Sequence, residues 1–200
     1  MECAILDTAV FELNRVGWSL LTMEGVAAGA GAGKGSLYRR WPTKQALVAA
    51  ALRHGVPSRT GGPALGGLRD ELILLAAESR ARLASPQGRA LCRVLEACRD
   101  DDALPFRDLF IVTLAEPVKR RVRELVRRAA HDDAAGPVAP DAGVTDLMVD
   151  SLLAALMYPF AEPDLTELVD RVLLPTLYGG KRAVPRASLS PLGRATVRPS

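Results

Sequence analysis

The chain has 200 residues, of which 48% are hydrophobic and 24% charged, with a formal net charge of +3. This is enough apolar sequence to fill the core of one globular domain of ordinary size or two small ones. Charged residues interrupt every apolar cluster before it reaches the roughly 20 residues of a membrane-spanning helix. The first residues also lack the basic start and apolar stretch of a signal peptide. We therefore expect a cytoplasmic protein without a membrane partner.

The charge is distributed unevenly along the chain. Residues 1–55 carry six Lys and Arg against four acids, residues 56–178 carry fifteen against nineteen, and residues 179–200 carry five against none. Four cations of the first segment lie within eleven residues that contain no acid, and these are Lys34, Arg39, Arg40 and Lys44. A local basic patch on a nearly neutral body indicates a polyanionic partner that is contacted at one end of the protein.

The cysteines and histidines give no sign of a metal site or a catalytic centre. Cys3, Cys92 and Cys98 are odd in number, and none forms a CxxC pair or stands at ligand spacing from His54 or His131. No Ser/His/Asp set or paired carboxylates share one helix face. We expect no metal, no cofactor and no enzymatic activity.

Apolar residues recur at intervals of three and four over most of the chain, and strand alternation is almost absent, which predicts an all-α fold. The first 55 residues are expected to form four helices. Their expected ranges are about 2–16, 22–30, 34–40 and 44–54. The residues that delimit them are the stop Gly17, the cap Thr22, the breaker Pro42 and the cap Thr43.

A Pro/Gly-rich loop at residues 56–67 separates this unit from a longer helical one. The next helices are expected at about 68–84, 86–98 and 105–132, with Ser85 and Pro86 opening the second of them. Pro117 should kink the third helix or split it in two. The last 22 residues, 179–200, are basic and without periodicity, so we expect them to be disordered.

A second loop at residues 134–143 precedes two amphipathic helices, whose apolar residues have the i, i+3, i+4, i+7 spacing of a buried face. One stripe consists of Val144, Leu147, Met148, Leu152, Ala155 and Leu156. The other consists of Leu165, Leu168, Val169, Val172, Leu173 and Leu177. The basic run at residues 119–128 is expected to be a solvated helix face, with Val118, Val122, Leu125 and Val126 facing inward, and not a second nucleic-acid site.

The stretch GAGAGKGSLYRRW at residues 29–41 has the composition of a phosphate-binding loop but not its spacing. A Walker loop needs a glycine where Ala28 stands and a hydroxyl where Gly35 stands, and no strand precedes the stretch. The residues fit better with a helix, a tight turn at 31–33 and a second helix. Two helices joined by such a turn form the arrangement that reads a DNA major groove. Lys34 and Lys44 each begin a helix, where the dipole disfavours a cation by about 0.3–1 kcal/mol unless a phosphate binds there.

The residue order of this segment is similar to the DNA-binding domain of TetR-type transcriptional repressors. The family pattern T-x-x-x-[IV]-A-x-x-A-G-x-x-K-G-[ST]-L-Y-x-x-[FW]-P-[ST]-K-x-x-L is matched without a gap. The matching residues are Thr22, Val26, Ala27, Ala30, Gly31, Lys34, Gly35, Ser36, Leu37, Tyr38, Trp41, Pro42, Thr43, Lys44 and Leu47. The match covers about the first quarter of the chain, and the remainder agrees only in its helical architecture.

The resemblance implies a ligand-responsive DNA-binding transcriptional regulator. Its domains would be a helix-turn-helix domain at 1–55, a linker at 56–67 and a helical effector-binding and dimerisation domain at 68–178. The implied phosphate contacts are Thr22, Ser36, Tyr38 and Lys44, and the residues implied to approach base edges or adjoining phosphates are Lys34, Gly35 and Arg39. Tyr38 stays open between this role and a place in the core, because a tyrosine has an apolar body and a polar tip.

In that family the last two helices pack against their copies in a second subunit, so the resemblance implies a homodimer that reads a palindromic operator. Release by a small apolar effector is implied as well. From the residues alone, the two stripes fit the core of one subunit equally well. Candidate residues for the effector pocket are Leu95, Phe106, Phe110, Leu114, Leu152 and Phe160. The alternative is a helical small-molecule-binding protein or enzyme that does not bind DNA.

Overall fold

The computed structural model describes residues 1–55, 66–98, 100–130, 141–157 and 164–178, and these form helices without a strand among them. The N-terminal helices are α1 (Glu2–Leu20), α2 (Met23–Gly29), α3 (Lys34–Arg40) and α4 (Lys44–His54). They are followed by α5 (Leu68–Leu83), α6 (Pro86–Ala97), a short 3-10 turn (Asp100–Ala103), α7 (Leu104–Phe110), a π-helical turn (Ile111–Ala115) and α8 (Glu116–Ala130). The last elements are α9 (Ala142–Met157), α10 (Leu165–Leu168), a second π-helical turn (Val169–Leu173) and α11 (Leu174–Leu177). The predicted all-α fold is confirmed.

The predicted helix caps are formed as expected. The hydroxyls of Thr22, Thr43 and Ser85 accept hydrogen bonds from the backbone N–H of Gly25, Ala46 and Gly88, at 3.0–3.1 Å. Each hydroxyl thereby satisfies one of the amides that a helix start leaves unpaired. At Gly17 the backbone leaves the helical region, with φ +79°, and one further turn continues to Leu20. The predicted stop is therefore an interruption within α1.

Pro117 is accommodated by a π-helical turn, so the predicted long helix is divided at this point into α7, the turn and α8. A proline has no N–H and cannot bond the carbonyl four residues before it, which here belongs to Thr113. The guanidinium of Arg82 on α5 donates to that carbonyl at 2.8 Å. The backbone acceptor that Pro117 leaves without its usual helical partner is therefore satisfied from a neighbouring helix.

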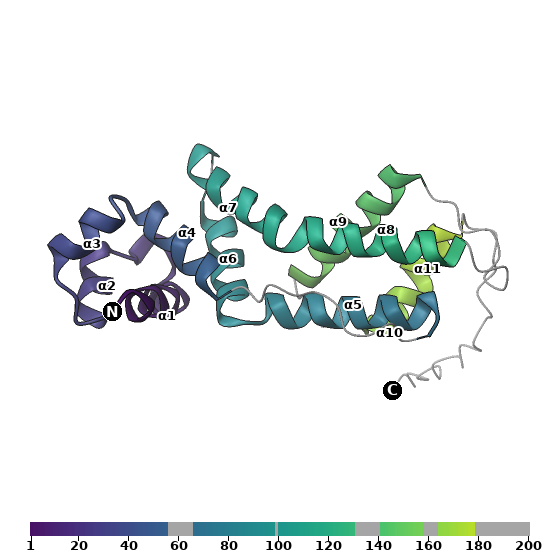
Figure 1. Cartoon of the computed structure of the whole chain (residues 1–200), viewed down its shortest axis with the longest axis horizontal. Coiled ribbons are helices and arrows are strands. Elements are labelled where there is room, and N and C mark those ends of the chain that lie inside the picture. The colour runs from purple at the N-terminus through teal and green to yellow at the C-terminus, as the bar shows by residue number, and fades with distance from the viewer. Residues whose placement is uncertain (56–65, 99, 131–140, 158–163, 179–200) are drawn as a thin grey trace, which may run out of the picture.

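The helices enclose two hydrophobic cores along an elongated molecule (Figure 1). The first core lies among α1–α4 at one end and includes residues of α6 and α7, among them Leu91, Val94 and Phe106. The second lies among α5, α8, α9, α10 and α11 at the other end. The first core thus continues past the expected linker, of which residues 56–65 lie outside the described residues.

No described helix is both long and apolar enough to cross a membrane.

The two apolar stripes predicted for the last helices are divided between core and surface. In α9 the residues Met148, Leu152 and Leu156 are buried, whereas Val144, Leu147 and Ala155 are exposed. The buried face of α9 also contains Val149 and Leu153, because α9 packs against both α5 and α8 and turns this side toward them. In the final helical rod, which consists of α10, the second π-helical turn and α11, the residues Leu165, Val169, Leu173 and Leu177 are buried. In the same rod Leu168 is half-buried and Val172 is exposed.

The expected loop at 134–143 is described only from residue 141, and the expected tail at 179–200 lies outside the described residues.

Candidate nucleic-acid interface

The turn between α2 and α3 has the geometry of a Schellman motif. Gly31 has φ +61°, a left-handed conformation that favours glycine. Its N–H bonds the carbonyl of Ala28, and the N–H of Ala32 bonds the carbonyl of Ala27 at 2.8 Å. The turn ends α2 sharply and lets α3 leave at an angle, as a helix-turn-helix requires.

One side of α3 anchors the helix in the first core, and the opposite side faces solvent. Leu37 is fully buried, and Trp41 directly after the helix is also buried. The remaining residues of α3 are all exposed: Lys34, Gly35, Ser36, Tyr38, Arg39 and Arg40. A Cβ added at Gly35 would meet no atom within 4 Å, so packing within the chain does not require a glycine there. An absent side chain at this position allows another molecule to approach the backbone of α3 closely.

Tyr38 lies outside the core, since 42% of it is exposed. Its hydroxyl donates a hydrogen bond of 2.8 Å to the Glu24 carboxylate on α2. This bond holds the pKa of Glu24 below its usual value, and Lys34 lowers it further by charge attraction. It also raises the pKa of Tyr38, because ionisation would break the bond. An ionised Glu24 therefore fixes the tyrosine at the edge of the exposed face of α3.

The cations on α3 differ in their partners. Arg40 forms an ion pair with Glu2 on α1 and lies over the Trp41 ring, 5.6 Å from its centroid. Lys34 and Arg39 have neither a hydrogen bond nor an ion pair from their side chains to any described residue. These two cations are consequently available to an external anion.

Lys44 is held between the first turn of α4 and the end of α1. Its ammonium donates to the carbonyl of Trp18 at 2.9 Å and lies 4.3 Å from the centroid of the Trp18 ring. Trp18 in turn meets the edge of Phe106 on α7, with centroids 5.3 Å apart. A contiguous set of contacts therefore joins α4 to α7 through the end of α1.

Five of the predicted DNA-contacting residues lie in α3, whereas Thr22 caps α2 and Lys44 begins α4. Three of them already have bonds within the chain in addition to their predicted role: Thr22 caps α2, Tyr38 donates to Glu24, and Lys44 binds Trp18. Glu24, Glu2 and Trp18 were not predicted to take part. A motif identifies the residues it contains, whereas these partners come from other helices or from variable positions between the motif residues.

The described residues that were predicted for an effector pocket are divided between the two cores. Leu95 and Phe106 belong to the first core, Leu152 to the second, and Phe110 packs against both. Leu114 belongs to the second core and also lines a hollow between α4, α5, α6 and α7. Phe160 lies outside the described residues. The polar residues of that hollow, Arg82, Ser85, Gln87 and Thr113, were not predicted.

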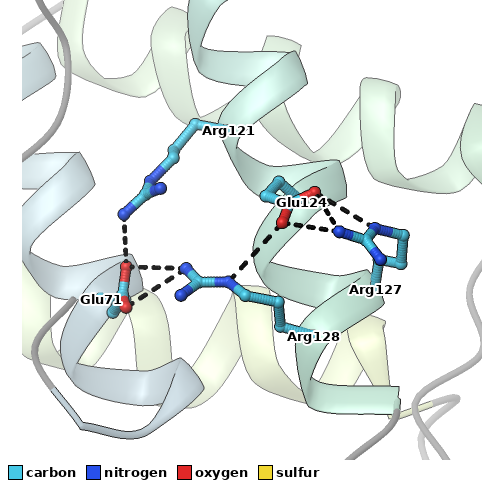
Figure 2. Close-up of polar contacts among 5 residues, drawn as sticks. All are labelled: Glu71, Arg121, Glu124, Arg127 and Arg128. Atoms are coloured by element: carbon cyan, nitrogen blue, oxygen red, sulfur yellow. Dashed lines mark hydrogen bonds and ion pairs between the residues drawn. The ribbon is translucent and has the colours of Figure 1, made fainter.

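The basic run of α8 is not a simple solvated face, because most of its cations are paired. Arg121 and Arg128 both bind Glu71 on α5, as Figure 2 shows. Lys119 and Arg123 bind Asp150 and Asp146 on α9, and Arg127 binds Glu124 on its own helix. The run therefore connects α8 to both neighbouring helices. The predicted inward direction of Val118, Val122 and Leu125 is confirmed by their burial, and Val126 is half-buried against the second core.

Comparison with known proteins decides the family. Residues 5–51 match the family model described as "Bacterial regulatory proteins, tetR family". The DNA-binding transcriptional repressor TetR of Mycobacteroides abscessus is 30% identical over 185 residues, covering 90% of this chain and 96% of that protein. The chain belongs to the TetR family. Two other relatives, the uncharacterised HTH-type transcriptional regulators of Mycobacterium tuberculosis and Mycobacterium bovis, are each 29% identical over 179 residues, or 88% of this chain and 87% of theirs.

Solved structures agree with this TetR fold. A TetR transcriptional regulator from Agrobacterium tumefaciens has a TM-score of 0.59 at 24% identity, over 88% of this chain and 92% of that chain. The fatty acid degradation regulator FadR from Bacillus halodurans has a TM-score of 0.57 at 17% identity, over 88% and 94%. This TetR-family protein is a DNA-binding transcriptional regulator and not an enzyme, as predicted. The alternative of a helical protein without DNA binding is thereby set aside.

Proposed function

We propose that this TetR-family regulator is a repressor that binds a palindromic operator as a homodimer and is released by a small-molecule effector. The observation that carries the proposal is the contrast between two sets of cations. On α8 most cations are bound to acids of the same chain, whereas Lys34 and Arg39 on α3 face solvent without a described partner. Exposed, unpaired cations on a recognition helix fit a polyanion such as DNA.

In this proposal α3 lies in the major groove, with Lys34, Gly35 and Arg39 at the base edges or adjoining phosphates. Ser36 and Tyr38, with Thr22 and Lys44 at the starts of α2 and α4, would contact backbone phosphates. Hydroxyls and amides near helix starts suit phosphate oxygens, while Lys and Arg suit guanine acceptors in the groove. Residues 1–55 would act as the DNA-binding domain and 68–178 as the effector-binding and dimerisation domain, on either side of the linker 56–67.

The proposed dimer forms through the last two helices. Although α9 packs on the second core, its residues Val144 and Leu147 are exposed, and so is Val172 of the final helical rod. Large apolar side chains left exposed on neighbouring helices are typical of a protein interface. A symmetric dimer would present two copies of α3 to two operator half-sites about 34–36 Å apart.

The proposed response to an effector works through helices shared by the two ends of the molecule. The last turn of α4 lines the hollow through Leu52, and its first residue is Lys44. Helix α7 lines it through Leu109 and reaches Lys44 through Phe106 and Trp18. A molecule that moves either helix on binding would reposition the DNA-binding residues, which is the two-state coupling that release requires.

Replacing Lys44 by alanine should weaken DNA binding and reduce its dependence on salt. Each lost phosphate contact lowers the slope of log K against log salt by about 0.9. Fluorescence anisotropy of the labelled DNA upstream of the protein's own gene, measured at several salt concentrations, gives both quantities. Arg53→Ala is the control, because it removes an exposed cation from the other end of the same helix. Binding that ignores both salt and Lys44 would refute the role of this lysine.

Replacing Glu24 by glutamine should strengthen DNA binding. The change removes a negative charge beside Tyr38 and Lys34 but keeps an acceptor for the tyrosine hydroxyl. Removing one repulsive charge contact at about 4 Å is worth about 1 kcal/mol in water, or roughly fivefold in affinity. Glu12→Gln on α1 provides the matched control, since it changes the net charge equally. Equal effects of the two variants in the same anisotropy assay would show that Glu24 has no local role.

A further inference from the structure

The hollow at the junction of α4, α5, α6 and α7 combines an apolar wall with one cationic group. Its cavity volume is about 40 Å³, and it is partly open to solvent. Arg82 lines it together with five leucines, namely Leu52, Leu83, Leu91, Leu109 and Leu114. An apolar pocket with a few convergent polar groups is the usual form of a small-molecule site.

The shape of this hollow depends on a close approach of α6 to the end of α5. A Cβ added at Gly88 would lie 2.1 Å from the carbonyl oxygen of Arg82, which no side chain tolerates. The glycine therefore lets the first turn of α6 press against the last turn of α5. Gln87, whose side chain has no hydrogen bond to a described residue, also lies in the wall of the hollow, where its amide packs against Gly55.

Arg82 is the unusual group in the hollow, because it is partly buried without a carboxylate partner. Within the described part of the chain its side chain forms one hydrogen bond, to the neutral carbonyl of Thr113. Burial lowers the pKa of Arg82, and the charge of Glu78 one turn earlier raises it, although the two form no ion pair. Of the other half-buried cations among the described residues, Arg121 and Lys119 each bind a carboxylate directly, whereas Lys44 binds the carbonyl and the ring of Trp18.

A guanidinium offers five N–H donors in a planar fork, which matches the two oxygens of a carboxylate. The single bond to Thr113 leaves most of these donors free of described protein acceptors. Charge-assisted bonds to an anion are roughly twice as strong as bonds between neutral groups. The chemistry of the hollow therefore favours an anionic group at Arg82 and an apolar group against the leucines.

We propose that this hollow binds a small molecule with an apolar body and a carboxylate, and that the carboxylate binds Arg82. The apolar body would lie against Leu52, Leu91 and Leu109. This inference names the chemical class of the effector. It rests on the proposed function for the statement that binding in the hollow releases the DNA. It replaces the purely apolar effector expected from the sequence by an amphipathic acid.

Binding of simple acids to the purified full-length protein tests the site. Hexanoate, decanoate and benzoate are titrated by isothermal calorimetry, and hexanamide, decanamide and benzamide serve as neutral counterparts of the same shape. At least one acid should bind about tenfold or more tightly than its amide, since charge-assisted bonds contribute about 1.5–3 kcal/mol. Acids that bind no better than their amides, or that do not bind, would overturn the proposal without any variant.

Variants of Arg82 then test the residue. Arg82→Gln keeps a donor for the Thr113 carbonyl but removes the charge, and it should lose about tenfold in affinity for the acid and little for the amide. Arg80→Gln, on the exposed side of the same helix, should bind as the wild type does. Thermal melting of each variant confirms that it is folded. Unchanged acid binding by folded Arg82→Gln would overturn the assignment.

The anisotropy assay separates this inference from the proposed function. An acid that binds through Arg82 and also releases the upstream DNA supports both. An acid that binds through Arg82 and leaves the DNA bound supports the carboxylate site but refutes its role as the effector site. Release of DNA by neutral molecules alone supports a ligand-responsive regulator and refutes the carboxylate site.

Discussion

Leu147→Glu is expected to convert the dimer to a monomer and to weaken operator binding by about 100-fold or more. The expected size follows from avidity, because two linked DNA-binding domains bind at least about 100-fold more tightly than one. Leu147 on α9 is 68% exposed in the single chain, although it belongs to an apolar stripe. In the proposed dimer it is covered by the second subunit, where a glutamate would be a buried, unpaired charge. Sedimentation velocity reports the mass, and anisotropy reports the affinity for DNA.

Leu104→Glu is the control for this experiment. It places the same charge at another exposed leucine, on α7, outside the proposed interface. The control should remain dimeric and bind DNA as the wild type does. A dimer that tolerates Leu147→Glu would refute the part of α9 in the interface, and a wild-type protein that is monomeric at working concentration would refute the proposed assembly itself.

Replacing both Arg121 and Arg128 by alanine is expected to lower the free energy of unfolding by about 3–5 kcal/mol, as is typical when a buried charge loses its partners. Glu71 is only 6% exposed, and these two arginines supply its hydrogen bonds (Figure 2). Without them the carboxylate at the start of α5 is left buried without a charged partner. Urea denaturation followed by circular dichroism measures the change, at a fixed protein concentration because an oligomer's stability depends on it.

Arg127→Ala provides the comparison on the same helix. Arg127 binds Glu124 one turn earlier; the arginine side chain is exposed and the glutamate side chain is partly exposed. Exposed pairs of this kind contribute about 0–1 kcal/mol. A double variant that is no less stable than Arg127→Ala would mean that Glu71 is satisfied without its arginines.

The parts of the fold that follow from local signals could be predicted from the sequence. The bounds of α3 and α4 were predicted because Gly33, Pro42, Thr43 and Gly55 act on their immediate neighbours. Family membership was predicted from a motif that the sequence matches without a gap. The turn between α2 and α3 fixes the spacing of the motif residues on either side of it. The roles of Lys34, Arg39 and the other DNA-contacting residues stay predictions, since a single chain does not display its partner.

Contacts between distant helices could not be predicted in this way. The Arg82–Thr113 and Arg121–Glu71 bonds join residues 31 and 50 positions apart, and nothing in the composition specifies them. The effector residues were selected for being large and apolar, a property that core and pocket walls share. Leu114 lines the hollow, while Phe106 lies in the first core and meets Trp18 edge to face. Exposed Leu147 and buried Leu152 likewise belong to one periodic stripe, and only the packing of α9 distinguishes them.

The shared first core limits how this regulator can be recombined. Leu91 and Val94 of α6 and Phe106 of α7 are buried together with α1–α4, so part of the interior of the DNA-reading unit is encoded after the linker. A chimera that joined residues 1–55 to the body of another regulator would inherit α1 without the surface that covers it. Exchange of operator specificity between such proteins is therefore restricted to the exposed residues of α3 unless the matching faces of α6 and α7 are transferred as well.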